Sequence, residues 1–202
     1  MIKNIIFDFG DIFINLDKTG LQENLQKLGL TDWNSELNAL NETYEKGECT
    51  EEGFLCGIQK HVPQKELQEI KERWCTILAD FPLYRLEFLE KLSKQNYRLF
   101  LLSNTDAIHI AHFQKTVGEE FYNRFFNSFK KVYFSFEMGL RKPQPEIYTQ
   151  VLTENNLIAS ETLFVDDKKE NTDSARALGI QVWNLQVGKE DVADLFDVIK
   201  FN

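Results

Sequence analysis

Five short apolar runs recur along this chain, and a segment with helical character separates each from the next. The runs show no regular alternation of apolar and polar residues, so we expect them to be buried on both faces, as the strands of a parallel sheet are. Strand, helix and strand in this rhythm predict βαβ units, and hence an α/β fold with a doubly wound parallel sheet. The five runs are Ile5–Phe9, Tyr97–Ser103, Lys131–Ser135, Thr162–Asp167 and Ile180–Leu185, and the later helical segments include Pro145–Leu152 and Asp191–Phe201.

The stretch between the first and second runs is different, because residues 16–82 contain no strand pattern and four successive helical patterns. Thr50 stands as an N-cap before two acidic residues, which marks one of the helix starts. A crossover between parallel strands needs only one helix, so residues 16–82 are expected to form an inserted four-helix cap on an α/β core of residues 1–15 and 83–202. Such a cap would cover the carboxyl ends of the strands, where open α/β sheets bind ligands, and could act as a lid. The alternative is an insert that only packs.

Composition narrows the class of protein. A length of 202 residues suits one domain carrying a smaller inserted one. The 23 basic and 32 acidic residues give a net charge of -9, which argues against a nucleic-acid partner or a basic membrane-surface protein. Cys49, Cys56 and Cys75 lack metal-ligand spacing and are expected to be free thiols. No apolar run approaches the ~20 residues of a membrane span, and no cleavable signal pattern is present. We expect a cytoplasmic monomer or homodimer without a membrane partner.

Polar side chains stand where three of the predicted strands end, and a lysine follows a fourth. Because parallel strands present their carboxyl ends at one edge of the sheet, these groups should converge there. Clustered carboxylates repel one another unless a cation lies among them, and oxygen ligands of this kind suit Mg²⁺. The residues are Asp8, Ser103, Asn104, Lys142, Asp166 and Asp167.

The segments that carry these residues resemble the motifs of the haloacid dehalogenase (HAD) superfamily, whose members are mostly phosphatases with an aspartyl nucleophile. They are FDFG, LLSNT, RKPQPEIY and FVDDKKEN, and they span nearly the whole chain. The insert, with its YEKGECTEEGF segment, is similar to the helical cap of subfamily I. The chain looks closest to the branch of epoxide-hydrolase N-terminal domains and sugar-1-phosphate phosphatases. The resemblance implies a Rossmann-like core.

Carried over residue by residue, the resemblance implies a role for each strand end. Asp8 matches the nucleophile and a metal ligand, and the carbonyl of Gly10 matches a second ligand. Ser103 and Asn104 match phosphate binders. Lys142 matches the lysine that neutralises the phosphoenzyme.

The acidic pair is expected to complete the metal site. Asp167 is the preferred direct ligand of Mg²⁺, with Asp166 beside it or acting through water. Asn171 lies one helical turn beyond Asp167, so it could face the same site and support the ligands from behind.

The predicted function is therefore a Mg²⁺-dependent phosphatase that hydrolyses a small phosphorylated metabolite, a sugar phosphate or a similar monoester, through an aspartyl-phosphate on Asp8. In the usual family pattern, the side chain two residues after the nucleophile protonates the leaving oxygen, which contributes roughly 10²–10⁴ in rate. Gly10 cannot do this. Three outcomes are open: a leaving group that needs little protonation, a substitute from Asp11, a cap residue or water, or slow turnover. Because side chains alternate along a strand, a loop contact is favoured for Asp11 over a surrogate acid.

Two other functions compete with this one. A haloacid dehalogenase also lacks the second aspartate, but it uses no metal, and the extra pair Asp166-Asp167 would then repel Asp8. A non-catalytic module that binds a phosphorylated ligand is the other alternative. Substrate choice should lie in the cap, with Tyr44, Glu45, Lys46 and Phe54 as candidates. His109 and His112 are expected at the surface or the edge of the core.

Overall fold

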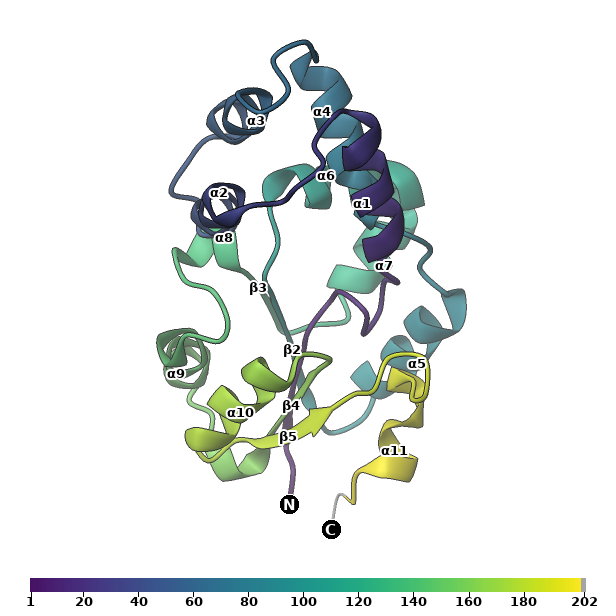
Figure 1. Cartoon of the computed structure of the whole chain (residues 1–202). Coiled ribbons are helices and arrows are strands. Elements are labelled where there is room, and N and C mark those ends of the chain that lie inside the picture. The colour runs from purple at the N-terminus through teal and green to yellow at the C-terminus, as the bar shows by residue number, and fades with distance from the viewer. Residues whose placement is uncertain (201–202) are drawn as a thin grey trace.

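The computed structural model describes residues 1–200 and contains one sheet of five parallel strands in the order β3-β2-β1-β4-β5 (Figure 1). Each strand overlaps one of the apolar runs, and only the ends differ by one or two residues. The strands are β1 (Asn4–Phe7), β2 (Arg98–Ser103), β3 (Lys131–Phe134), β4 (Thr162–Asp166) and β5 (Gln181–Asn184). The predicted α/β fold with a doubly wound parallel sheet is confirmed.

Helices cover both faces of the sheet. Neighbouring strand residues point to opposite sides, and the apolar ones on each side are buried against helices. On one face, Ile5 and Phe7 belong to a buried cluster with residues of the helices α5 (Leu83–Ser93), α6 (Ala107–Val117), α7 (Glu119–Phe126) and α11 (Leu195–Val198). On the other face, Ile6 packs in a cluster with α9 (Pro145–Glu154) and α10 (Lys169–Ala177). Burial on both faces explains why the apolar runs do not alternate.

Four helices lie between β1 and α5, and they have a hydrophobic cluster of their own (Figure 1). They are α1 (Lys18–Lys27), α2 (Ser35–Glu45), α3 (Glu51–Gln59) and α4 (Leu67–Trp74), followed by the 3₁₀ turn η1 (Cys75–Ile77). Phe54, Ile58 and Ile70 are fully buried in this cluster. The side chain of Thr50 accepts a hydrogen bond from Gly53 N, so the predicted N-cap is confirmed. We call residues 16–82 the helical insert.

The two ends of the helical insert run side by side. Asn15 N donates to Asp80 O at 2.9 Å, and Asp17 N donates to Ile77 O at 2.8 Å. The insert also touches the core where α2 ends, near α8 (Ser135–Met138). Gly47 has φ +69°, and a Cβ there would come within 2.1 Å of Phe136 O, so only glycine fits this approach. These contacts hold the insert over the carboxyl edge of the sheet.

The C-terminal prediction was wrong in its extent. Instead of one helix over Asp191–Phe201, the chain forms the 3₁₀ turn η3 (Val192–Asp194) and the short helix α11. A capping box at Asp191 starts the turn at the predicted residue, and the helical segment already ends at Val198, because Ile199 has an extended backbone. Phe201 lies outside the described residues. None of the helices within residues 1–200 is long and apolar enough to cross a membrane.

Candidate active site

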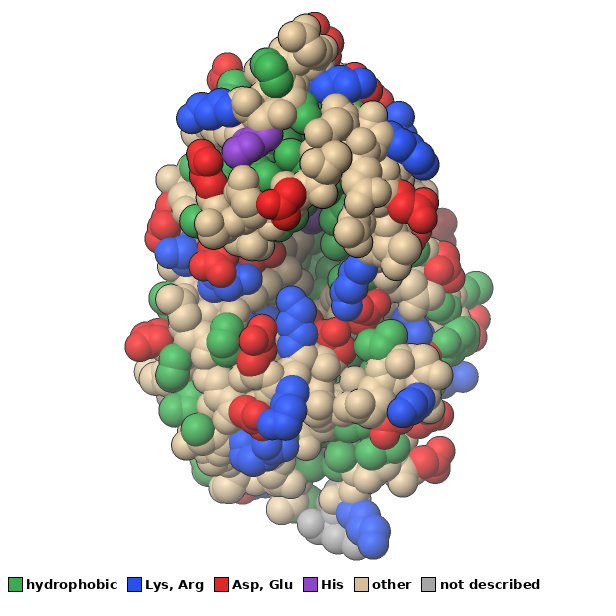
Figure 2. All heavy atoms as spheres, in the orientation of Figure 1, with side chains coloured by type: hydrophobic (Ala, Val, Ile, Leu, Met, Phe, Trp, Pro, Cys, Tyr) green, Lys and Arg blue, Asp and Glu red, His purple; other side chains and the backbone are tan. Residues whose placement is uncertain are grey.

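A cavity of about 250 Å³ lies between the carboxyl ends of the strands and the helical insert. Figure 2 shows it as a hollow below the α1–α4 helices, with basic and acidic side chains at its rim. The sheet order places β1 between β2 and β4, so the residues that follow these three strands meet at one edge. Asp8, Ser103, Asn104, Lys142 and Asp167 all line the cavity, as the convergence of strand ends predicted.

Lys142 joins two of the carboxylates in the floor of the cavity. Its Nζ lies 2.8 Å from Asp8 Oδ1 and 2.7 Å from Asp166 Oδ2, and the whole residue is only 1% exposed. Burial lowers the pKa of Lys142, but the carboxylates of Asp166 and Asp8 raise it by more, so the ammonium group keeps its charge. Lys142 therefore provides a fixed positive charge beside Asp8.

The carboxylate of Asp8 is oriented through one of its oxygens. Phe9 N donates to Asp8 Oδ1 at 2.7 Å, and Lys142 contacts the same atom. Oδ2 has no recorded partner within residues 1–200 and remains available to a ligand. Burial raises the pKa of Asp8 to about 7, and repulsion from Asp166 adds to this, while Lys142 opposes it. A cation beside Asp8 would favour its ionised form.

Asp166 lies behind Asp8 and is held by groups of the segment that follows β4. Asn171 Nδ2 donates to both Asp166 oxygens at 3.0 Å, and Lys168 N donates to Oδ1 at 2.8 Å. Asn171 thus contacts Asp166, whereas the sequence had related it to Asp167. Its own Oδ1 is buried without a partner among the described residues, and Asn171 lines the cavity.

These acidic residues fit a divalent cation. One oxygen from each of Asp8, Asp166 and Asp167 lies within 4.8 Å of the other two. Burial raises the pKa of Asp167 and the nearby Asp166 adds to this, so a cation among these carboxylates would favour their ionised forms. Hard carboxylate oxygens and the unpartnered amide oxygen of Asn171 are the donor set that Mg²⁺ and its bound waters prefer. The predicted magnesium site is therefore consistent with the arrangement of these residues.

Ser103 and Asn104, at the end of β2, make different contacts, which the sequence did not distinguish. Ser103 is 2% exposed and lines the cavity, where its hydroxyl can face a ligand. The amide side chain of Asn104 instead donates to Lys142 O at 2.8 Å and accepts from Lys142 N at 2.9 Å. In this arrangement the Asn104 side chain positions the segment that carries Lys142. The phosphate contact of Asn104 stays a prediction.

Gly10 lines the cavity beside a leucine that occupies the space a side chain would need. A Cβ at Gly10 would lie 2.9 Å from Leu16 Cδ1. Leu16 also lines the cavity. The position that in the usual family pattern carries a carboxylic acid is therefore filled by an apolar side chain, and no acid at residue 10 could enter without moving Leu16.

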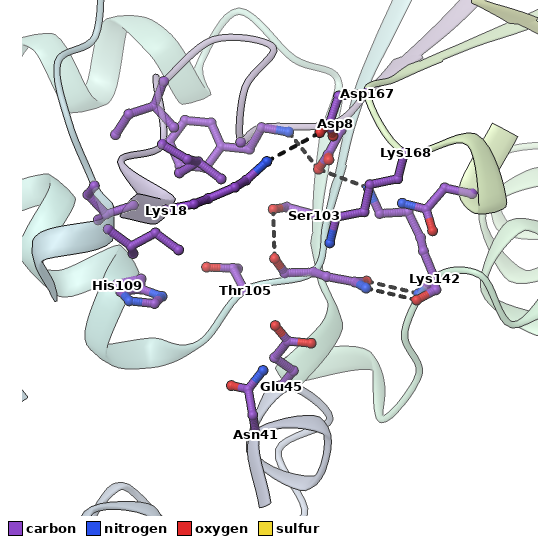
Figure 3. A pocket seen from close by; sticks show the side chains of 18 of the residues that line it. Asp8, Lys18, Asn41, Glu45, Ser103, Thr105, His109, Lys142, Asp167 and Lys168 are labelled. Atoms are coloured by element: carbon purple, nitrogen blue, oxygen red, sulfur yellow. Dashed lines mark hydrogen bonds and ion pairs between the residues drawn. The ribbon is translucent and has the colours of Figure 1, made fainter. Parts of the chain in front are cut away.

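Asp11 is directed into a local network away from the cavity lining. It has φ +57°, its Oδ1 accepts from Leu16 N at 3.0 Å, and Lys18 Nζ lies 2.6 Å from its Oδ2. Lys18 also approaches Asp167 Oδ2 at 3.7 Å (Figure 3). Asp11 thus fixes a turn and a lysine at the rim of the site. This geometry favours the loop contact over the surrogate acid.

A half-buried histidine links the helical insert to the core, a position that agrees with the surface or core-edge place expected from the sequence. His109 Nδ1 lies 2.9 Å from Asp106 Oδ2, and its ring stacks on Trp74 at 5.2 Å between centroids. Trp74 Nε1 donates to the same Asp106 oxygen at 3.0 Å. Burial lowers the pKa of His109, but Asp106 raises it by more, to above its ordinary value of 6.5. The i,i+3 spacing of Asp106 and His109 was a signal for this pair, whereas nothing in the sequence pointed to Trp74. His112 lines a separate cavity.

Comparison with known proteins identifies the family. A family model described as haloacid dehalogenase-like hydrolase matches residues 5–185. The chain belongs to the haloacid dehalogenase-like hydrolase family. This HAD membership confirms the resemblance found in the four motifs, while the narrower branch within the superfamily stays a prediction.

Similar proteins cover nearly the whole HAD chain. The D-ribitol-5-phosphate phosphatase of Bacteroides thetaiotaomicron is 30% identical over 204 residues, covering 94% of this chain and 95% of that protein. The sesquiterpene phosphatase astK of Aspergillus oryzae is 29% identical over 182 residues, covering 88% and 87%. A crystal structure of a HAD family enzyme from Bacteroides thetaiotaomicron, in complex with magnesium and inorganic phosphate, has a TM-score of 0.86 and 34% identity, covering 97% of this chain and all of that one.

Proposed function

We propose that this HAD-like hydrolase is a Mg²⁺-dependent phosphatase that acts on a small phosphorylated metabolite, a sugar phosphate or a similar monoester. The observation that carries the proposal is the buried Asp8 carboxylate, held on one oxygen by Lys142 and grouped with Asp166 and Asp167 in one cavity. A structure of a similar HAD enzyme in complex with magnesium and phosphate supports the same reading.

In this proposal the residues divide the reaction into two displacements. Asp8 Oδ2 attacks phosphorus, the P–O bond to the alcohol breaks, and the leaving oxygen takes a proton from water. Water then attacks phosphorus, the bond to Oδ2 breaks, and inorganic phosphate and the Asp8 carboxylate are released. Lys142 and the Ser103 hydroxyl stabilise the negative oxygens of the transferring group. A magnesium ion held by Asp8, the Gly10 carbonyl and Asp167, with Asp166 behind, would neutralise charge on the phosphoryl group.

The leaving group is the second part of the proposal. Leu16 fills the place of an acid at residue 10, and Asp11 is engaged by Lys18 and the backbone. General acid help of roughly 10²–10⁴ in rate is therefore absent, unless water or another side chain supplies it. Among esters that bind equally well, we expect faster hydrolysis of those whose alcohols leave easily.

We also propose that the helical insert acts as a cap over the site. Its side chains Lys18, Asn41, Glu45, Trp74 and Ile77 line the cavity together with the strand-end residues. The insert is joined to the core by the paired segments around Asn15 and Asp80, which are a suitable place for a hinge.

The deciding experiment measures phosphate release from a panel of phosphate esters, with magnesium and with a chelator, for the wild type and for Asp8→Asn. The proposal requires release that depends on the metal and is lost in Asp8→Asn. Halide release from a 2-haloacid without metal would instead identify a dehalogenase. Tight phosphate binding without any turnover would identify a binding module.

A further inference from the structure

Two side chains of α2 face the cavity from the side opposite the strand ends. Asn41 and Glu45 are four residues apart, so they lie on the same side of the helix, and both line the cavity. Figure 3 shows them next to each other on α2, directed toward the strand-end residues Ser103 and Thr105. Because Asp8 and Lys142 occupy the floor, a phosphate bound there would place its alcohol near these two side chains.

Glu45 is held in place by an arginine of the core. Arg141 Nη2 lies 2.8 Å from Glu45 Oε2, and Arg141 Nε donates to the same oxygen at 3.0 Å. Both contacts use Oε2, and within residues 1–200 no hydrogen bond is recorded for Oε1. The neighbouring Asn41 Oδ1 is buried and has no partner among the same residues. The wall of the cavity thus presents two acceptor oxygens toward a ligand, Glu45 Oε1, which solvent reaches, and Asn41 Oδ1, which is buried.

Buried acceptors without a partner are uncommon, because each one loses its hydrogen bonds to water. A bound ligand that brings donors would satisfy them. Neutral donors are sufficient, since Arg141 already pairs with the carboxylate of Glu45. Hydroxyl groups on the ligand are neutral donors of this kind.

We propose that Asn41 and Glu45 bind hydroxyl groups of the leaving alcohol, so that the substrate is the phosphate ester of a polyhydroxylated alcohol, a sugar or an alditol. This inference rests on the proposed phosphatase function. Trp74, Ile77 and Leu78 cover the carbon chain on the apolar side of the cavity. Hydrogen bonds to charged or buried acceptors are each worth about 1.5–3 kcal/mol, or about 10-fold to 150-fold in kcat/KM.

The test compares ribitol 5-phosphate with pentyl phosphate, which has the same chain length and no hydroxyl groups. The measured quantity is the ratio of kcat/KM for the two esters in one protein preparation, so a partly unfolded fraction cancels. Asn41→Leu and Glu45→Met remove the acceptors at similar side-chain size, and each should lower the ratio at least about 10-fold. Glu42→Met is the matched control, because Glu42 also pairs with Arg141 at 3.3 Å but does not line the cavity.

The ratio of kcat/KM for the two esters decides between the possible outcomes. A ratio that falls in both acceptor variants and is unchanged in Glu42→Met supports the proposal. A ratio unchanged in the acceptor variants, with phosphate still released, overturns the hydroxyl contacts and leaves the phosphatase function standing. A wild-type preference for pentyl phosphate also overturns them, and would direct attention to the cavity of about 300 Å³ between α1, α2 and α4, which is lined by Leu21, Leu25 and Trp33. No release from any ester, p-nitrophenyl phosphate included, overturns both proposals.

Discussion

Replacing Lys142 by methionine tests how far this buried ammonium holds the site together. Its Nζ pairs with Asp8 at 2.8 Å and with Asp166 at 2.7 Å, and Asp166 is completely buried. Removing one partner of a buried ion pair costs about 3–5 kcal/mol, because the remaining charges lose their compensation. Asp166 keeps the donors from Asn171 and Lys168 N, so the loss falls mainly on Asp8.

The loss of stability in Lys142→Met depends on pH. The direction of this dependence follows from the pKa of Asp8, which is raised to about 7 from its ordinary value of 3.8. Between these values the folded protein binds the proton more tightly than the unfolded chain, so stability falls as pH rises and levels off above the folded pKa. Without Lys142 that pKa rises further, because the lysine lowers it. The variant therefore keeps losing stability above pH 7, where the wild type has levelled off.

The assay is urea unfolding without divalent metal at about pH 5.5 and about pH 8.5. We expect Lys142→Met to lower the free energy of unfolding by about 3–5 kcal/mol at the higher pH and by clearly less at the lower one. Lys168→Met is the control, because this exposed lysine also lines the cavity, and we expect a change within about 0.5 kcal/mol. A cost below about 1 kcal/mol at the higher pH, or an equal cost at both, would refute the reasoning.

Three further predictions follow from the neighbouring residues. Gly10→Asp alone should cost about 1 kcal/mol or less, because its Cβ meets only the flexible end of Leu16, which must move aside. Combined with Leu16→Ala, Gly10→Asp should raise kcat for an alkyl phosphate by about 100-fold or more over Leu16→Ala alone, with little change for p-nitrophenyl phosphate. If kcat does not rise, the lack of a general acid at residue 10 does not limit the reaction. His109→Gln should destabilise the protein most below pH 6.5. The raised pKa of His109 keeps its ion pair with Asp106 formed at that pH, and the pair is lost as pH rises through this pKa. A difference in the free energy of unfolding that does not change with pH would contradict the prediction. Asp11→Asn should leave phosphate release largely intact, and loss of activity on alkyl but not aryl phosphates would instead make Asp11 the surrogate acid.

The sequence was sufficient for the sheet and for the floor of the site. Buried parallel strands leave a direct signal in local composition, and their carboxyl ends must meet at one edge, so the sequence alone groups Asp8, Lys142 and Asp167. The motifs around them added the family. The same reasoning overextended the C-terminal helix, because apolar spacing does not mark the residue at which a helix ends, and here the backbone becomes extended at Ile199.

Only the tertiary structure decided what surrounds the floor. Several contacts around the site depend on how the helical insert lies on the core. They are the contact of Leu16 with Gly10, the hydrogen bonds of Asn104 to the backbone of Lys142, and the position of Asn41 and Glu45 opposite Asp8. Periodicity records which face of a helix is buried, but it does not record which distant residue that face meets. Strand ends are brought together by topology alone, whereas contacts between two separately packed hydrophobic clusters arise only when the whole chain has folded.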